Sequence, residues 1–181
     1  MRRPGIWRVS AGVGLLMLGA CGSTEPEPAP PLCPATLLLD GAERITAYRP
    51  GAEPRASEIR YLAVLTDLTS DCRYFSGEDG AGVDVDLAFK LIAERGPAMS
   101  GDEEVSYFVQ AVGPDGRTLP GAQWMLGGDL GFVEGQDRVG WSEELTLRLP
   151  SVTPDNGASY TFYVGFPLDD AELKSPGQPL R

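Results

Sequence analysis

Histidine is missing from all 181 residues of the sequence, and lysine occurs only at positions 90 and 174. Without histidine there is no imidazole to act as general base for a serine or cysteine nucleophile, or to bind a transition metal. Neither Lys90 nor Lys174 stands in a Ser-x-x-Lys pattern, so lysine does not replace the missing base. We therefore predict no catalytic residue and no enzymatic activity.

Cofactor and metal motifs are also scarce. The glycine-rich segment 127–131 lacks the strand, helix and lysine of a phosphate-binding loop, so we expect a flexible loop there. The acidic segment 78–86 does not have EF-hand spacing. We expect Asp84 and Asp86 on the solvent face of a strand and residues 80–82 in a turn. The sequence thus predicts no cofactor and no metal, with calcium at this acidic segment as the alternative.

The first residues have the pattern of an export signal. Three arginines and no acidic residue precede an apolar stretch at 9–20. This stretch is shorter than the about 20 apolar residues that a membrane-spanning helix needs. The stretch ends in Leu-Gly-Ala-Cys at 18–21, which resembles the lipobox of bacterial lipoproteins. We predict a signal peptide at 1–20 and lipidation of Cys21; an ordinary secretory signal with a chance cysteine is the alternative.

Residues 21–32 form a proline-rich segment that we expect to be a solvated spacer, followed by one domain at 33–181. In enterobacteria an Asp after the lipidated cysteine retains a lipoprotein in the inner membrane, and Gly22 stands there instead. By this analogy we predict the periplasmic face of the outer membrane, with the inner membrane as the alternative. The predicted partners are the bilayer, through N-terminal acyl chains, and another envelope protein. The net charge of −11 argues against a nucleic-acid partner.

Two cysteines remain after Cys21. In an exported chain Cys33 and Cys72 are expected to form a disulfide, which would stabilise the fold by about 4 kcal/mol through the loop it closes. A metal site or a nucleophilic thiol is the competing interpretation. Neither has supporting residues nearby in sequence, because histidine and Cys-x-x-Cys spacing are both absent.

The remaining pattern predicts strands. Apolar residues alternate with polar ones at 83–91, 145–149 and 160–166, and the segment 105–112 is rich in aromatic and β-branched residues before a Pro-Asp-Gly turn. Weaker candidate strands lie at 36–39, 44–48, 59–68, 72–75 and 122–126. Helical periodicity is absent except for a short turn at 169–174. We therefore expect an all-β chain, an antiparallel immunoglobulin-like or fibronectin-like β-sandwich of about seven to nine strands.

Three further expectations concern side chains. Cys33 is expected before the first strand and Cys72 near the start of a middle strand, and residues 102–104 form a solvated strand entry. The aromatic residues of the later strands are expected in the core, with a ligand groove as the alternative. These aromatic residues are Trp124, Trp141, Tyr160 and Phe162.

Several short motifs resemble small alphaproteobacterial lipoproteins to which no activity is assigned. They are Cys33-Pro34, Asp71-Cys72-Arg73-Tyr74, the strand at 83–87, and the segments 93–98, 107–109 and 163–168. The resemblance covers most of the chain after Cys21. It implies a lipoprotein with a β-sandwich body and brings no catalytic residues with it.

These observations leave three classes of function open. The first is a membrane-anchored periplasmic lipoprotein that acts as a non-enzymatic binding or structural component of the cell envelope. The second is an accessory lipoprotein that binds a small molecule or a cation. The third and least favoured is a carboxylate-dependent hydrolase, which would need two carboxylates with separated pKa values facing across a cleft.

Overall fold

A computed structural model describes residues 31–77 and 80–168 of the chain. Cys21, the spacer up to residue 30 and the predicted turn at 169–174 lie outside the described residues. Within them are eight strands and two short 3-10 helices, which are β1 (Ala35–Leu38), β2 (Arg44–Tyr48), η1 (Ala56–Glu58), β3 (Ile59–Gly77), β4 (Gly80–Arg95), β5 (Glu104–Val112), β6 (Thr118–Asp129), β7 (Arg138–Pro150), η2 (Gly157–Ser159) and β8 (Thr161–Gly165).

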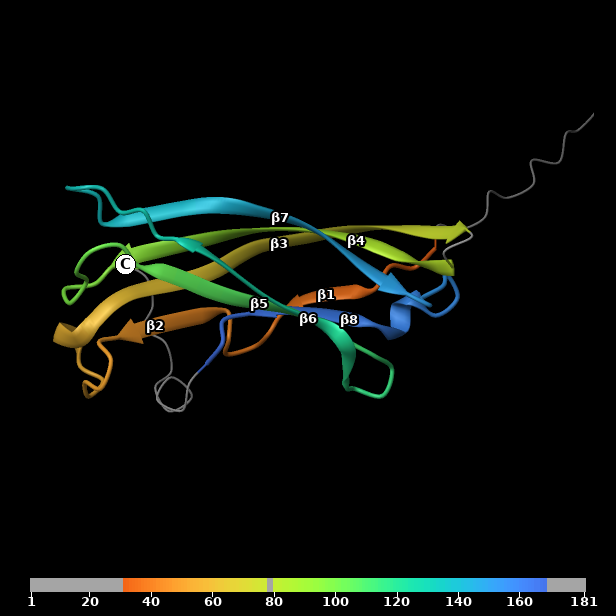
Figure 1. Cartoon of the computed structure of the whole chain (residues 1–181), viewed down its shortest axis with the longest axis horizontal. Coiled ribbons are helices and arrows are strands. Elements are labelled where there is room, and N and C mark those ends of the chain that lie inside the picture. Colours follow the sequence, from red (N-terminus) through yellow and green to blue (C-terminus); the bar gives the residue numbers. More distant parts are fainter. Residues whose placement is uncertain (1–30, 78–79, 169–181) are drawn as a thin grey trace, which may run out of the picture. The chain divides into compact units, whose positions relative to one another are not determined.

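The strands form two four-stranded sheets with the orders β1-β8-β5-β6 and β2-β3-β4-β7. All strand pairs are antiparallel except β1 and β8, which run parallel. Figure 1 views the layers from the side, with β7, β4 and β3 above β1, β5, β6 and β8. The predicted all-β sandwich is therefore confirmed.

The core lies between the two sheets, where the predicted alternation places it. On β4, Val83, Leu87 and Leu91 are fully buried. The Phe89 ring on the same face meets the edge of Tyr107 from β5, with 5.3 Å between the ring centroids. Apolar residues at every second position of a strand share one face, so the pattern of β4 fixes which face of its sheet is inside.

The strand β3 contains an irregularity that changes its inward-facing residues. The predicted strands 59–68 and 72–75 are one strand of 19 residues, and its pairing with β4 shifts between Thr66 and Thr69. Asp67 in this bulge has φ of 56°. One extra residue on a bulged strand reverses the alternation beyond it. The residues of β3 that point into the core therefore have odd numbers up to Leu65, whereas beyond the bulge they have even numbers, as at Cys72.

This reversal brings Cys72 to the predicted disulfide with Cys33, which the structure contains, with 5.7 Å between the Cα atoms. Cys33 precedes β1 as expected, but Cys72 lies well inside β3, so its placement near a strand start was wrong. The bridge links the segment just before β1 of one sheet to β3 of the other. Two hydrogen bonds flank it: Thr36 with Ser70 (2.7 Å), and the Tyr74 hydroxyl donating to the Leu32 carbonyl (2.6 Å).

Residues 127–129 and 80–82 lie in strands, in contrast to the predicted loop at 127–131 and turn at 80–82, while residues 130–131 lie outside any strand. Gly127 and Gly128 belong to β6, and a Cβ atom on Gly127 would lie 2.6 Å from the Val105 carbonyl oxygen. Gly82 lies within β4, where a Cβ would collide with the Leu149 carbonyl oxygen. Glycine at these positions permits close backbone approach, which the composition alone does not distinguish from a flexible loop.

The four aromatic residues pack in or against the core, as expected. Phe162 is fully buried, and the Trp124 ring stacks on it with 6.5 Å between the centroids. Trp141 and Tyr160 are partly buried and pack against the same cluster. Their positions favour the interpretation as core residues over that as a ligand groove.

Candidate functional site

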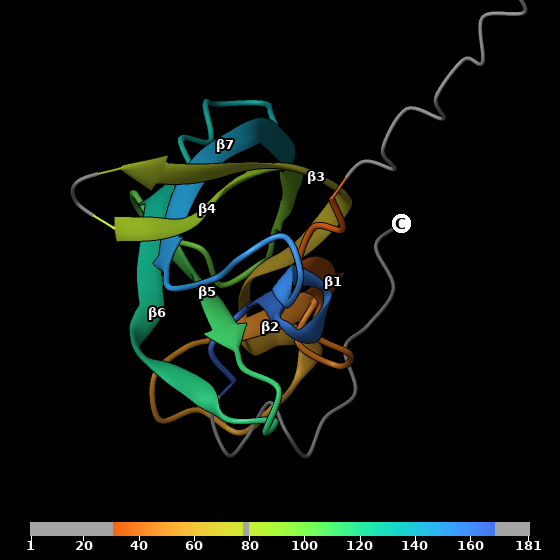
Figure 2. The same cartoon turned by 90° about the vertical axis from the view of Figure 1, so that its right-hand side faces the viewer.

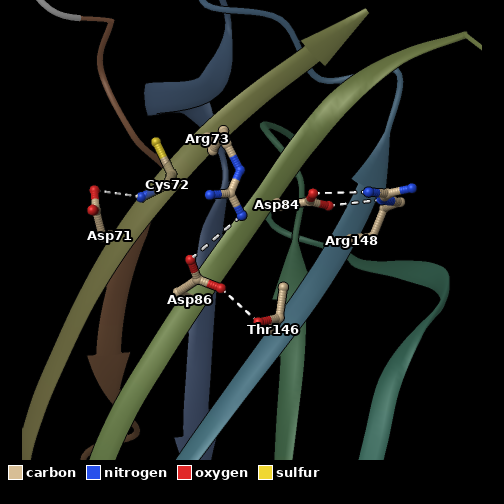
Figure 3. Close-up of polar contacts among 7 residues, drawn as sticks. All are labelled: Asp71, Cys72, Arg73, Asp84, Asp86, Thr146 and Arg148. Carbon is tan, nitrogen blue, oxygen red and sulfur yellow. Dashed lines mark hydrogen bonds and ion pairs between the residues drawn. The ribbon is translucent and has the colours of Figure 1, made fainter. Parts of the chain in front are cut away.

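The outer face of β3, β4 and β7 carries polar side chains in cross-strand rows. The strand register aligns Arg73 with Asp84 and Arg148 in one row, and Asp71 with Asp86 and Thr146 in the next. Figure 3 shows these side chains lying across the three strands. Side chains directly opposite one another on neighbouring strands interact, so each row forms one group of contacts.

The first row is held by an ion pair. The Arg148 Nε and Nη2 atoms donate to the two carboxylate oxygens of Asp84 at 2.7 and 2.8 Å. The same guanidinium lies 4.3 Å from the centroid of the Phe75 ring. Asp84 is on the outer face of β4, as expected, but it is only 8% exposed because Arg148 covers it. A bidentate pair of this kind explains Asp84 as a structural residue.

We expect Asp84→Asn to destabilise the chain near neutral pH and much less in acid. The hydrogen bonds from Arg148 hold the pKa of the Asp84 carboxyl below its ordinary value. A carboxyl with a lowered folded-state pKa contributes stability above its unfolded pKa, and this contribution is lost as the pH falls through the folded one.

Thermal unfolding of both proteins between pH 7 and pH 2 tests this prediction. The gap between their melting temperatures should narrow below about pH 4, the ordinary range of an aspartate. A gap that stays constant down to pH 2 would contradict the role of the charged Asp84. Asp155→Asn, at an exposed turn, is the control for losing one carboxylate.

The second row places two acids directly opposite each other. Asp71 on β3 faces Asp86 on β4. The Thr146 hydroxyl donates to Asp86 (2.6 Å), Arg73 lies 4.0 Å from Asp86, and Asp71 accepts the backbone N–H of Cys72 (2.8 Å). Like charges at directly opposed positions destabilise a sheet. Packing of the fold therefore does not account for this pair of carboxylates.

The third row has a small residue at its centre. Ala88 on β4 stands between Thr69 on β3 and Glu144 on β7. Because its neighbours are longer, the sheet surface is hollowed here, with a volume of about 500 Å³. We call this the Ala88 hollow. Its lining residues are Thr69, Ser70, Asp71, Asp86, Leu87, Ala88, Glu144, Leu145 and Thr146.

The Ala88 hollow has an excess of negative charge. Asp71, Asp86 and Glu144 line it, and among the described residues only Asp86 has a basic partner, Arg73. Elsewhere on this face the acids have partners: Lys90 lies 2.9 Å from Asp67, and Arg138 lies 3.6 Å from Glu94. An open, polar hollow rimmed by carboxylates suits a ligand with positive charges and hydrogen-bond donors.

Other acidic groups are less promising as sites. In the described part of the chain, no three His, Cys, Asp or Glu residues converge on a point that could hold a metal ion. Glu103 was expected in a solvated strand entry, but its carboxylate is mostly buried and accepts a hydrogen bond from Arg60 at 2.5 Å. A second hollow of about 390 Å³ in the β2–β3 loop contains the ion pairs Arg49–Glu58 and Arg55–Glu53, so its charges balance.

The Ala88 hollow was missed in the sequence because its residues are far apart in the chain. Asp71 and Glu144 are brought together only by the pairing of three strands and by the bulge in β3. The signal available in the sequence was that Asp84 and Asp86 alternate with apolar residues. This pattern predicted which residues lie on the outer face of β4, but not which residues of β3 and β7 lie beside them.

Comparisons with known proteins add no assignment to this geometry. Within the described residues, no helix is both long and apolar enough to span a membrane. No family model matches the chain, and comparison with curated proteins and with solved structures found no match.

Proposed function

We propose that the chain is an exported lipoprotein, anchored through Cys21, whose β-sandwich is a non-enzymatic binding domain of the cell envelope. The signal pattern and the lipobox-like ending at 18–21 support the anchor. The Cys33–Cys72 disulfide also favours export, because structural disulfides are typical of oxidising compartments. We place the chain at the periplasmic face of the outer membrane, with the inner membrane as the alternative.

For this domain, we propose an extended segment of an envelope protein, rich in lysine or arginine, as the partner. The observation that carries this proposal is the pair of opposed carboxylates, Asp71 and Asp86, with Glu144 nearby on β7. A basic segment laid across β3, β4 and β7 would neutralise the repulsion between these acids. Because the carboxylates lie around Ala88 and not about one point, they suit separated positive charges better than a single metal ion.

The binding is expected to be weak and salt-dependent. Exposed ion pairs contribute about 0.2–1 kcal/mol each and are screened at high ionic strength. A tether holding both partners at one membrane raises their effective concentration, so weak binding is sufficient. The excess charge of the Ala88 hollow would then determine which partner is selected.

We expect Asp71→Asn/Glu144→Gln to weaken binding of a lysine-rich probe about tenfold. The reason is the loss of two exposed charge interactions, which together amount to about 1.4 kcal/mol. The probe is a fluorescent octapeptide of alternating lysine and serine, and anisotropy at low and high salt measures its affinity for the detergent-solubilised chain. The matched control is Glu134→Gln/Asp155→Asn, which removes the same charge from exposed loop positions.

Equal loss of affinity in both double variants would contradict the site, because it would indicate attraction by net charge alone. Absence of binding at low salt would contradict the basic partner altogether. Spermidine is tested beside the peptide: if it binds more tightly and the same two substitutions abolish this binding, the small-molecule function replaces the protein partner.

A further inference from the structure

The edges of the two sheets are not equally protected against pairing with another strand. Among the strands that the structure describes, those at the edges are β1, β6, β2 and β7. β1 has only four residues, and the pairing of β2 shifts between Ala47 and Tyr48. β7 carries charged residues along its length, among them the part-buried Glu143, which accepts a hydrogen bond from the Trp141 indole at 2.5 Å. Short length, bulges and charges are the usual means by which proteins block sheet edges.

β6 has none of these features over residues 122–128. The segment contains no charged residue and no proline, and Gly121, with φ of 73°, lies just before it. Its pairing with β5 is regular from the pair formed by Gln110 and Gln123 to the pair formed by Glu104 and Asp129. Among the described residues β6 has a neighbouring strand on one side only, and in Figure 2 it runs along the margin of the sandwich. Its outer backbone groups are therefore available for pairing.

Charge is confined to one end of this edge, where Asp129 ends β6 and the Glu104 carboxylate on β5 lies beside Gly127. Met125 is 56% exposed on the outer face, and the strand register continues from Gln123 through Gln110 and Tyr163 to Leu37, which is 49% exposed. The chain has a net charge of −11, so two copies repel each other wherever their acids meet. Pairing along residues 122–128 places no charged β6 side chain of one copy opposite a charged β6 side chain of the other.

We propose that β6 pairs antiparallel with β6 of a second copy, with Met125 opposite Met125 at the twofold axis. In this register Trp124 stands opposite Leu126 of the other copy, and Gln123 stands opposite Gly127. The bulky indole meets an aliphatic side chain, and the long amide meets a glycine. A twofold contact uses the same surface on both copies, so this self-complementary sequence completes it without another partner. The β1-β8-β5-β6 sheets of the two copies then join into one sheet of eight strands.

Cysteine cross-linking tests both the contact and its register. In the Met125→Cys dimer the two new cysteines stand directly opposite each other. Opposed residues of an antiparallel pair have Cα atoms about 4.5–5.5 Å apart, which is within the about 4.4–6.8 Å that a disulfide needs. The full-length chain in native membranes is oxidised and resolved without reductant. We expect most of the Met125→Cys protein to run as a dimer that reductant dissociates. Less than a tenth of the Gln123→Cys or Leu37→Cys protein should form such a dimer. The unsubstituted chain controls for its own cysteines.

The second measurement is the mass of the detergent-solubilised chain by light scattering. A concentration-dependent dimer that Met125→Lys shifts to monomer supports the proposal. A monomer at every concentration, equal cross-linking of positions 123 and 125, or cross-linking to another protein would overturn it. Binding of the lysine-serine peptide to Met125→Lys keeps this test separate from that of the Ala88 hollow, which lies on the other sheet.

Discussion

Replacing both Cys33 and Cys72 by alanine is expected to lower the free energy of unfolding by about 4 kcal/mol. The bridge joins residues separated by 39 positions, and in the chain-entropy model a loop of this size restricts the unfolded chain by about that amount. For a domain of this size the loss corresponds to a fall in melting temperature of about 12 °C. The hydrogen bonds Thr36–Ser70 and Tyr74–Leu32 should still hold β1 against β3 below that temperature.

Thermal and urea unfolding of the double variant measure this effect, and the unsubstituted chain with reductant should reproduce it. Thiol titration of the unreduced, denatured Cys21→Ser chain should find almost no free thiol. A change in melting temperature below about 2 °C would show that the bridge contributes little. Two equivalents of free thiol before reduction would show that it does not form.

Cys21→Ser is expected to abolish fatty-acid incorporation and to release the chain from the membrane fraction. Each buried methylene of an acyl chain contributes about 0.8 kcal/mol to membrane binding, so loss of the acyl chains removes the proposed anchor entirely. Cells grown with a fatty-acid probe are fractionated, and label and chain are followed together. Continued labelling of the Cys21→Ser chain would contradict the lipoprotein proposal.

The matched control for this experiment is Cys33→Ala/Cys72→Ala, which removes the other two cysteines. It should keep its label and remain with membranes even though its domain is less stable. Loss of label from this variant as well would mean that labelling depends on folding of the domain. The effect of Cys21→Ser would then not identify the lipidation site.

The sequence contained enough information to predict which face of each main strand is buried. Val83 to Leu91 alternate cleanly, and burial of one face follows directly from that period. The disulfide also followed from the residues, since Cys33 and Cys72 were the pair left after Cys21. These features depend on local pattern and on the number of cysteines, which a single chain displays without knowledge of its neighbours.

The remaining features depend on contacts between distant segments. Asp67 gives no local signal of a bulge, yet that bulge joins two predicted strands and turns Cys72 inward. Gly127 looks like a loop residue because its close contact with the Val105 carbonyl lies on another strand. The Ala88 hollow needs the register of three strands at once. Pairing register is set by the whole sheet, so sequence alone did not predict this site.

Mapping of the lysine-serine peptide on the chain by NMR most directly tests the central claim, that the domain binds a basic segment at the Ala88 hollow. Chemical shifts of backbone amides are followed in the detergent-solubilised chain during titration at low salt. We expect saturable changes centred on Thr69, Asp71, Asp86, Ala88 and Thr146, and their loss in Asp71→Asn/Glu144→Gln. Changes spread over the acidic loops, or centred elsewhere on the sandwich, would contradict it.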